Sequence, residues 1–215
     1  MDGYVSETEQ VEQIWRWWKD NGRALVLGLV VGLGGLAGYR YWDAAQTARA
    51  ESASINYQQF LQLAGGDRTE DAVKTGRAIV DGYPDTTYAR LSTLLLAKLA
   101  VEKNDYPQAK IELKKLVDDG GAGEIGNVAR ARLARILLAE GAADEADKFI
   151  AAVPAGTSGD RDAELRADIH AARGQIDAAR TQYLLALAAA EKLGLDRDSI
   201  QIKLDNLPSA KSHGS

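Results

Sequence analysis

Residues suited to acid–base, nucleophilic or metal chemistry are scarce in this chain. It has two histidines and no cysteine among 215 residues, whereas zinc and nucleophilic sites commonly use paired or clustered His and Cys. His170 falls inside an expected helix, where an aromatic side chain would pack, and His213 falls in a Ser- and Gly-rich tail, 209–215, expected to be flexible. Acidic pairs such as Asp118–Asp119 are typical of helix ends. The sequence therefore predicts no enzyme, no metal site and no cofactor.

The segment Gly32–Gly38 superficially resembles a dinucleotide-binding loop, but no strand pattern precedes it. It lies instead within an uncharged run of sixteen residues, Ala24–Tyr39, bounded by Arg23 and Arg40. At ~1.5 Å per helical residue the run spans about 24 Å, less than the ~30 Å hydrocarbon core, so flanking residues must complete a membrane crossing. Aromatic residues suited to both headgroup regions flank it: Trp15, Trp17 and Trp18 before, and Tyr39, Tyr41 and Trp42 at its end.

We expect residues 24–42 to form a single transmembrane helix that acts as a signal anchor. A buried core helix is one alternative, but aromatic clusters at both ends have no reason to accompany it. A cleavable signal peptide is another, because Ala48–Ala50 matches the small-x-small pattern of a cleavage site. The region before the run is acidic and aromatic rather than short and basic, which favours the anchor.

Basic residues next to the span indicate its orientation. Arg16, Lys19 and Arg23 precede it, whereas Arg40 and Arg49 follow it. This bias predicts that 1–23 is a cytoplasmic segment and that 43–208 forms a domain across the membrane. The lack of cysteine excludes a disulfide framework and leaves the redox compartment open.

Within the span, small residues have the spacing of helix-packing motifs. Gly28 and Gly32 form one G-x-x-x-G pair, and Gly34 and Gly38 form another. Such pairs allow another helix to approach closely, although glycine is also simply frequent in membrane helices. We expect these four glycines to form a packing site for a membrane partner.

After the span, composition and periodicity predict an all-α domain. Alanine, leucine and charged helix formers dominate, and apolar residues recur at three- and four-residue steps. Four alanines mark the second helices of successive helix pairs: Ala72, Ala109, Ala146 and Ala179. Units of about 34 residues with small residues at helix crossings are typical of tetratricopeptide repeats, which stack into an α-solenoid. The consensus is degenerate, so a single helical bundle with coincidental alanines is the alternative.

The periodicity and turn signals predict ten helices. They are expected near 6–22, 24–62, 69–82, 86–103, 106–119, 124–140, 143–152, 160–173, 176–193 and 198–206. The turn signals between paired helices are Asn104–Asp105, Gly141 and Gly174.

First helices of such pairs line a concave face that commonly binds peptides or proteins. By register, we expect a protein-binding groove formed by Tyr57, Leu61, Leu94, Lys98, Val101, Arg135 and Leu138. This mixed apolar and basic lining suits an extended, partly hydrophobic chain or an acidic segment, although the leucines could equally pack between repeats. With a net charge of −5 and no basic field, the chain is not expected to bind nucleic acid.

Four short segments occur in a characteristic order: Asn21–Leu25 (NGRAL), Gly38–Trp42 (GYRYW), Ala53–Gln58 (ASINYQ) and Ile202–Leu207 (IKLDNL). Together with the acidic N-terminus and the degenerate repeats, they resemble the ancillary SecYEG translocon subunit family of Gram-negative bacteria. The resemblance implies a single-pass inner-membrane protein with a cytoplasmic N-terminus and periplasmic repeats. It further implies association with the translocon and with a membrane-anchored periplasmic chaperone of the prolyl-isomerase type, and it brings no catalytic residues.

Two classes of function follow. The first is a chaperone adaptor at the translocon that helps secreted or unfolded client proteins after they cross the membrane. The second is an envelope assembly scaffold, serving cell-division or outer-membrane machinery through its repeats.

Overall fold

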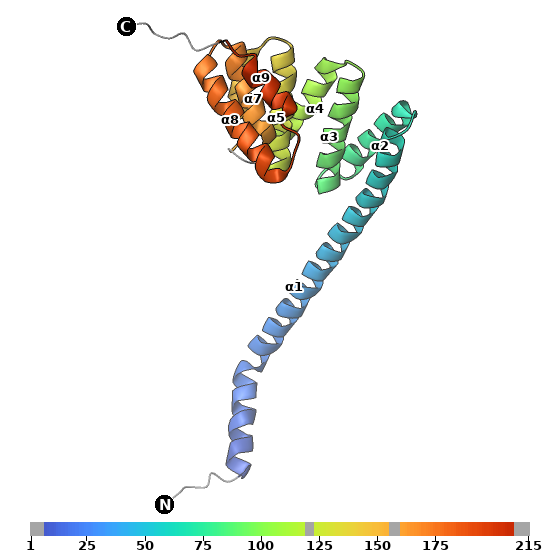
Figure 1. Cartoon of the computed structure of the whole chain (residues 1–215). Helices are drawn as coiled ribbons and strands as arrows, with labels where there is room; N and C mark the ends of the chain where they lie inside the picture. Colours follow the sequence, from blue (N-terminus) through green and yellow to red (C-terminus); the bar gives the residue numbers. More distant parts are fainter. Residues whose placement is uncertain (1–6, 119–122, 155–159, 209–215) are drawn as a thin grey trace, which may run out of the picture. The chain divides into compact units, whose positions relative to one another are not determined.

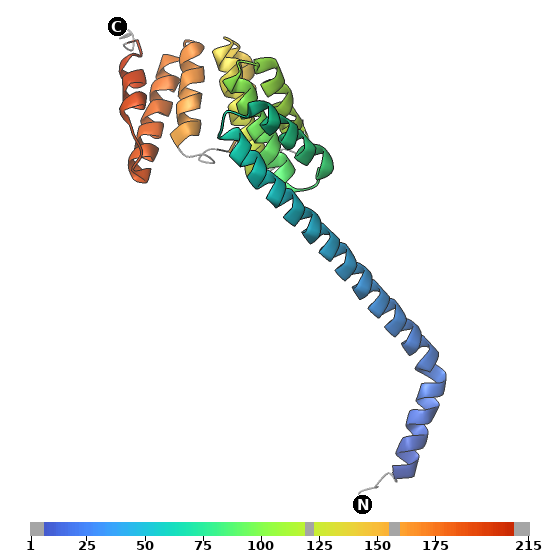
Figure 2. The same cartoon turned by 90° about the vertical axis from the view of Figure 1, so that its right-hand side faces the viewer.

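The computed structural model describes residues 7–118, 123–154 and 160–208, and all regular elements in these ranges are α-helices (Figures 1 and 2). They are α1 (Glu7–Ala64), α2 (Thr69–Gly82), α3 (Thr87–Glu102), α4 (Tyr106–Asp118), α5 (Glu124–Ala139), α6 (Ala143–Ala151), α7 (Asp160–Ala172), α8 (Ile176–Leu193) and α9 (Asp198–Asp205). The chain divides into two compact units, Met1–Ser52 and Ala53–Ser215. The predicted all-α class is confirmed, while the tail 209–215, with His213, lies outside the described residues.

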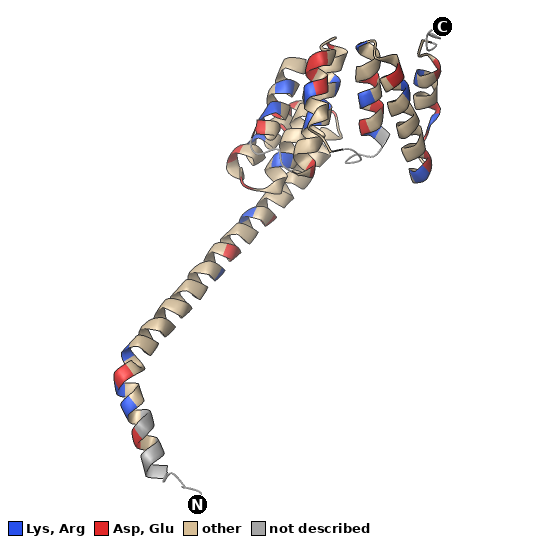
Figure 3. Cartoon of the chain, turned by 90° about the vertical axis from the view of Figure 1, so that its left-hand side faces the viewer, with Lys and Arg blue, Asp and Glu red and all other residues tan. Residues whose placement is uncertain are grey.

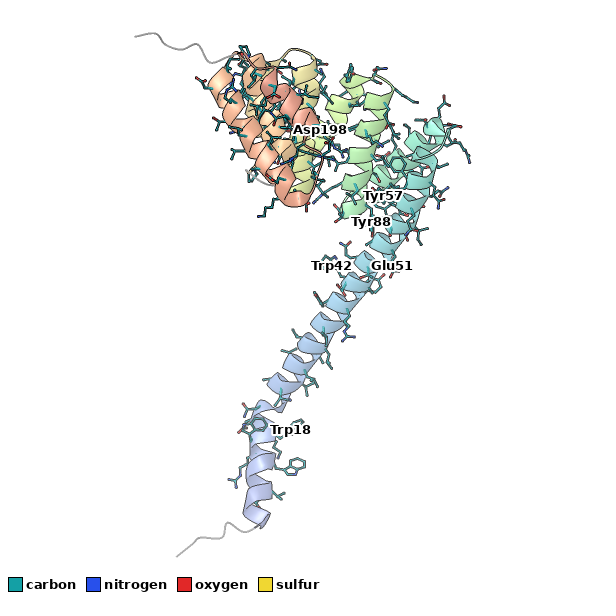
Figure 4. All side chains as sticks on the ribbon, in the orientation of Figure 1. Trp18, Trp42, Glu51, Tyr57, Tyr88 and Asp198 are labelled. Atoms are coloured by element: carbon teal, nitrogen blue, oxygen red, sulfur yellow. The ribbon has the colours of Figure 1, made fainter. Side chains whose placement is uncertain are left out.

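The first helix differs from the expected pair 6–22 and 24–62, because α1 continues without interruption through Gly22 and Arg23. An interior glycine costs a helix only about 1 kcal/mol and, unlike proline, removes no hydrogen bond. Two local contacts hold this turn together. Asn21 donates from its side chain to the carbonyl oxygen of Trp17 at 3.2 Å, and the Trp18 ring lies over Gly22. Figure 4 shows α1 bending next to the labelled Trp18.

The apolar part of α1 is exposed within its own unit. Leu27, Val31 and Leu36 have 66%, 67% and 55% of their surface exposed, and the uncharged stretch is visible in Figure 3 as a tan segment between charged ends. Among the described residues, this is the one helix long and apolar enough to cross a membrane by length and composition. Its exposure contradicts the alternative of a buried core helix and fits a membrane anchor.

In the second unit, the hairpin turns repeat one backbone motif. Asn104, Gly141 and Gly174 each have a positive φ, of 59°, 80° and 71°. The next residue's N–H then donates to the carbonyl oxygen five residues earlier, as in Asp105 to Ala100 at 2.8 Å and Ala142 to Leu137 at 2.9 Å. This Schellman-type ending satisfies helix carbonyls and favours Gly or Asn at the left-handed position. The predicted turn signals are therefore confirmed.

The marker alanines lie where paired helices cross. Ala72, Ala109, Ala146 and Ala179 are all fully buried. They belong to three successive core clusters, which run from the end of α1 through α3, from α3 to α7, and from α7 to α9. Successive helices pack along the unit from α2 to α9 in chain order. A linear stack of hairpins, rather than a bundle around one centre, explains why the core is divided in this way.

Candidate functional site

The candidate site is a face formed by the first helices of successive hairpins, α3, α5 and α7, with α9 at one end. It contains two hollows. The first, of about 320 Å³, is lined by Ala97, Lys98, Val101, Leu113, Arg132, Arg135 and Ile136. The second, of about 360 Å³, is lined by Arg135, Leu138, Ala139, Arg161, Glu164, Leu165, Asp168 and Lys203. Volumes near 300 Å³ are at the lower end for ligand-binding pockets, enough for a few side chains of a partner.

The structure brings together four of the seven predicted groove residues. Lys98 and Val101 line the first hollow, Leu138 lines the second, and Arg135 lines both. The α-helical register explains this, because residues three and four positions apart share a helix face. Whether this face binds a protein stays a prediction.

The other three predicted groove residues lie elsewhere. Leu94 is only 8% exposed and belongs to the core, because its side chain packs between repeats. Leu61 is 45% exposed and lines neither hollow. The ring of Tyr57 packs against Tyr88, with ring centroids 5.8 Å apart, so Tyr57 joins the end of α1 to α3, as the labelled side chains in Figure 4 show.

Arg132 was missed by the sequence reasoning and is the most enclosed cation of the first hollow. Its guanidinium donates to the backbone carbonyl oxygen of Leu94 at 3.0 Å, which fixes α5 against α3. Burial lowers the pKa of Arg132 from its ordinary value, the positive charge of Arg135 lowers it further, and Tyr57 acts in the opposite direction. The sequence did contain a signal for Arg132, because it lies three residues before the predicted groove residue Arg135 and so shares its helix face. Arg161, also missed, lies across the second hollow, where its carbonyl oxygen accepts a hydrogen bond from Arg135 at 3.1 Å.

A polar network closes the α9 end of the second hollow. The Lys203 ammonium donates to Glu164 at 2.6 Å and to Asp168 at 2.8 Å. The Tyr183 hydroxyl donates to the other oxygen of Asp168 at 2.6 Å. Burial by itself lowers the pKa of Lys203, but the two carboxylates outweigh it and the pKa is raised. Burial and the bond to Asp168 also raise the pKa of Tyr183. The network positions α9 against α7 and α8.

In the first unit, the four predicted glycines are open to a partner. A Cβ added at Gly28, Gly32, Gly34 or Gly38 would meet nothing within 4 Å. By helical periodicity, the pair Gly34 and Gly38 lies about a third of a turn around the axis from Gly28 and Gly32. The two pairs therefore form two adjacent small-residue strips, and their packing role stays a prediction.

No catalytic arrangement emerges from the described part of the chain. His170 is partly exposed and its Nδ1 lies 2.6 Å from Oε1 of Gln175 at the α7–α8 turn, which is a local contact rather than the aromatic core position expected. No group of three or more His, Asp or Glu among the described residues is placed to hold a metal ion.

The stack of helical hairpins defines a helical-repeat protein. A family model described as a tetratricopeptide repeat-like domain matches residues 15–209, and the chain belongs to that family. The chain is 28% identical over 204 residues to a Haemophilus influenzae protein named ancillary SecYEG translocon subunit, covering 94% of this chain and 98% of the relative. It is also 28% identical to the Escherichia coli K12 protein of the same name, over 96% and 99% of the two chains.

A third relative with that name, from Aggregatibacter actinomycetemcomitans, is 29% identical over 94% of this chain and 98% of the relative. These full-length similarities confirm the resemblance that the short segments of the sequence indicated. They also agree with the single apolar helix near the N-terminus.

Proposed function

We propose that this protein is a membrane-anchored, protein-interaction subunit of the Sec translocon, with its repeat domain in the periplasm. In this role it is a chaperone adaptor that brings a prolyl-isomerase-type chaperone and secreted clients together as clients emerge. The observation that carries the proposal is the match along nearly the whole chain to relatives named as translocon subunits. The exposed apolar helix and the hollowed face of α3, α5 and α7 supply the two surfaces that such a role needs.

The two surfaces have separate tasks in this proposal. The span, with its glycine strips, contacts the membrane-embedded translocon, since helices in lipid associate by close packing of small residues. The hollowed face binds soluble protein segments, because its apolar floors are rimmed by polar groups that fix orientation. Contact with the lipid bilayer itself is made by the aromatic residues at both ends of the span.

Co-purification in mild detergent tests the proposal. The tagged full-length protein is expected to recover translocon subunits and a prolyl-isomerase-type chaperone, identified by mass spectrometry. The double variant Lys98→Glu/Arg135→Glu should keep the translocon and lose most of the chaperone or client. Both side chains are exposed. Among the described residues, the ion pair that the variant removes is Lys98 with Glu102 at 3.3 Å, a surface pair worth at most about 1 kcal/mol.

Lys114→Glu is the matched control, because Lys114 is exposed on α4 and lines neither hollow. It should recover both partners as the unaltered protein does. Recovery of cell-division or outer-membrane assembly proteins without any translocon subunit would instead establish the envelope scaffold.

A further inference from the structure

Arg135 has an unusual place on the hollowed face, because it lines both hollows. One hollow lies between α3 and α5, and the other between α5, α7 and α9. Each has an apolar floor, formed by Val101, Leu113 and Ile136 in the first and by Leu138 and Leu165 in the second. A segment that fills both hollows therefore passes over α5 next to Arg135.

The charges around this crossing point are unbalanced. Lys98, Arg132 and Arg161 also line the two hollows. Within the described ranges, no carboxylate is within ion-pair distance of Arg132 or Arg135, which donate to carbonyl oxygens instead. The acidic side chains of the second hollow, Glu164 and Asp168, are already bound by Lys203. An acidic group placed over α5 would gain charge-assisted hydrogen bonds with little competition from the protein's own carboxylates.

We propose that this face recognises an extended peptide segment in which an acidic side chain lies between two apolar ones. The carboxylate binds Arg135, and the apolar side chains enter the hollows on either side. Neighbouring packed helices are about 10 Å apart, so two adjacent inter-helix hollows have a similar separation. Three to four extended residues at ~3.3 Å each span it. Residues two before and two after the acid lie on the same face of the segment as the acid. This assignment rests on the proposed protein-binding role of the face and adds the chemistry of its ligand.

Peptide binding to the full-length protein in detergent tests it. The probe is a fluorescent peptide with the core Leu-Ser-Asp-Ser-Leu and both ends capped, so that no terminal carboxylate is present. Two comparison peptides are used: one has Asn in place of Asp, and the other has Ser in place of both Leu residues. Fluorescence anisotropy at low salt should show the acidic peptide binding about tenfold more tightly than the amide peptide, as a charged hydrogen bond allows. The peptide without Leu should bind far more weakly than either.

Arg135→Gln should remove most of the acidic peptide's advantage, because the carboxylate loses its direct partner while the apolar floors stay in place. Lys114→Gln, on α4 outside the hollows, should keep the preference. The inference would be overturned if the unaltered protein bound the two peptides equally or bound no peptide. It would also be overturned if Arg135→Gln kept the full preference for the acidic peptide. None of these results affects recovery of the translocon, so failure here is distinguishable from failure of the proposed function.

Discussion

The ring of Phe60 occupies the space that a side chain at Gly76 would need. A Cβ added at Gly76 would lie 2.6 Å from the Cζ of Phe60, and Phe60 is fully buried. Each later hairpin has a buried pair with the same spacing of sixteen residues, but there the first residue is small and the second is large. There, Ala97, Ala134 and Ala167 precede Leu113, Ile150 and Tyr183, and all six are buried. In the first hairpin the large side chain at the helix crossing therefore comes from the first helix, whereas in the later hairpins it comes from the second helix.

This exchange of large and small residues predicts a compensating pair of substitutions. Gly76→Leu alone overpacks the crossing and should lower the free energy of unfolding by about 1–3 kcal/mol. Phe60→Ala alone leaves a cavity and should cost about 3–5 kcal/mol. The double variant restores the small–large order of the later hairpins, so its loss should be clearly smaller than the sum. Urea unfolding of the four proteins measures this coupling.

Gly82→Ala is the control for backbone effects, since a Cβ there meets nothing within 4 Å. It should be neutral or slightly stabilising, by up to about 1 kcal/mol from helix propensity. Additive losses in the Phe60/Gly76 cycle would show that the two positions do not share one packing space.

The network around Asp168 predicts a loss of stability in alkali. The pKa values of Tyr183 and Lys203 are both raised in the folded state, whereas in the unfolded chain both groups lose protons near pH 10. Above that pH the unfolded state binds fewer protons than the folded state, so the free energy of unfolding falls as pH rises. Their contribution is fully present below about pH 10 and disappears as the pH passes the raised values.

Thermal unfolding followed from pH 8 to pH 11 measures this slope. Tyr183→Phe removes the phenol while keeping the buried ring, and should make the decline in melting temperature above about pH 10 shallower. Lys110→Gln is the comparison variant, because Lys110 pairs with Glu140 at 2.7 Å, outside the Asp168 network. A slope unchanged by Tyr183→Phe would remove Tyr183 from the explanation.

Topology has a clean test because the chain has no cysteine. Cys introduced at Ser6 or at Ser199 is treated with a membrane-impermeant maleimide in cells whose outer membrane has been permeabilised. We expect only Ser199→Cys to react, since the basic bias before the span predicts a cytoplasmic N-terminus. Reaction at position 6 alone would reverse the orientation. A mature chain lacking its first fifty residues would establish a cleaved signal peptide instead.

The glycines of the span predict the route of membrane association. Gly28→Leu with Gly32→Leu makes the helix more apolar, so insertion should persist while close approach of a partner helix is blocked. Recovery of translocon subunits in detergent should fall severalfold. Leu29→Ile with Leu33→Ile is the control, which keeps bulk on the same helix and should change little. If the glycine variant recovered translocon subunits as well as the unaltered protein does, the main contact would lie in the repeat domain.

The sequence alone determined most of the secondary structure and the order of the hairpins. Left-handed positions at Asn104, Gly141 and Gly174 and the buried alanines five residues later depend on local backbone sterics and on one small residue per crossing, so they are readable from spacing. The long apolar helix was equally readable, because an uncharged run between aromatic flanks is a pattern of consecutive residues. The break expected near Gly22 was wrong, since a single glycine weakens a helix without ending it.

Only the tertiary structure decided which predicted groove residues share a surface. Helical register placed Leu94 and Lys98 on neighbouring parts of one face, but packing against α5 buries Leu94 and leaves Lys98 exposed. Likewise, the place of Arg135 between two hollows depends on α3, α7 and α9 meeting around α5. The exchange between Phe60 and Gly76 is also tertiary, because volume is shared across a helix crossing rather than set at one position. Local sterics and periodicity act within one helix, whereas burial and shared volume exist only after helices pack.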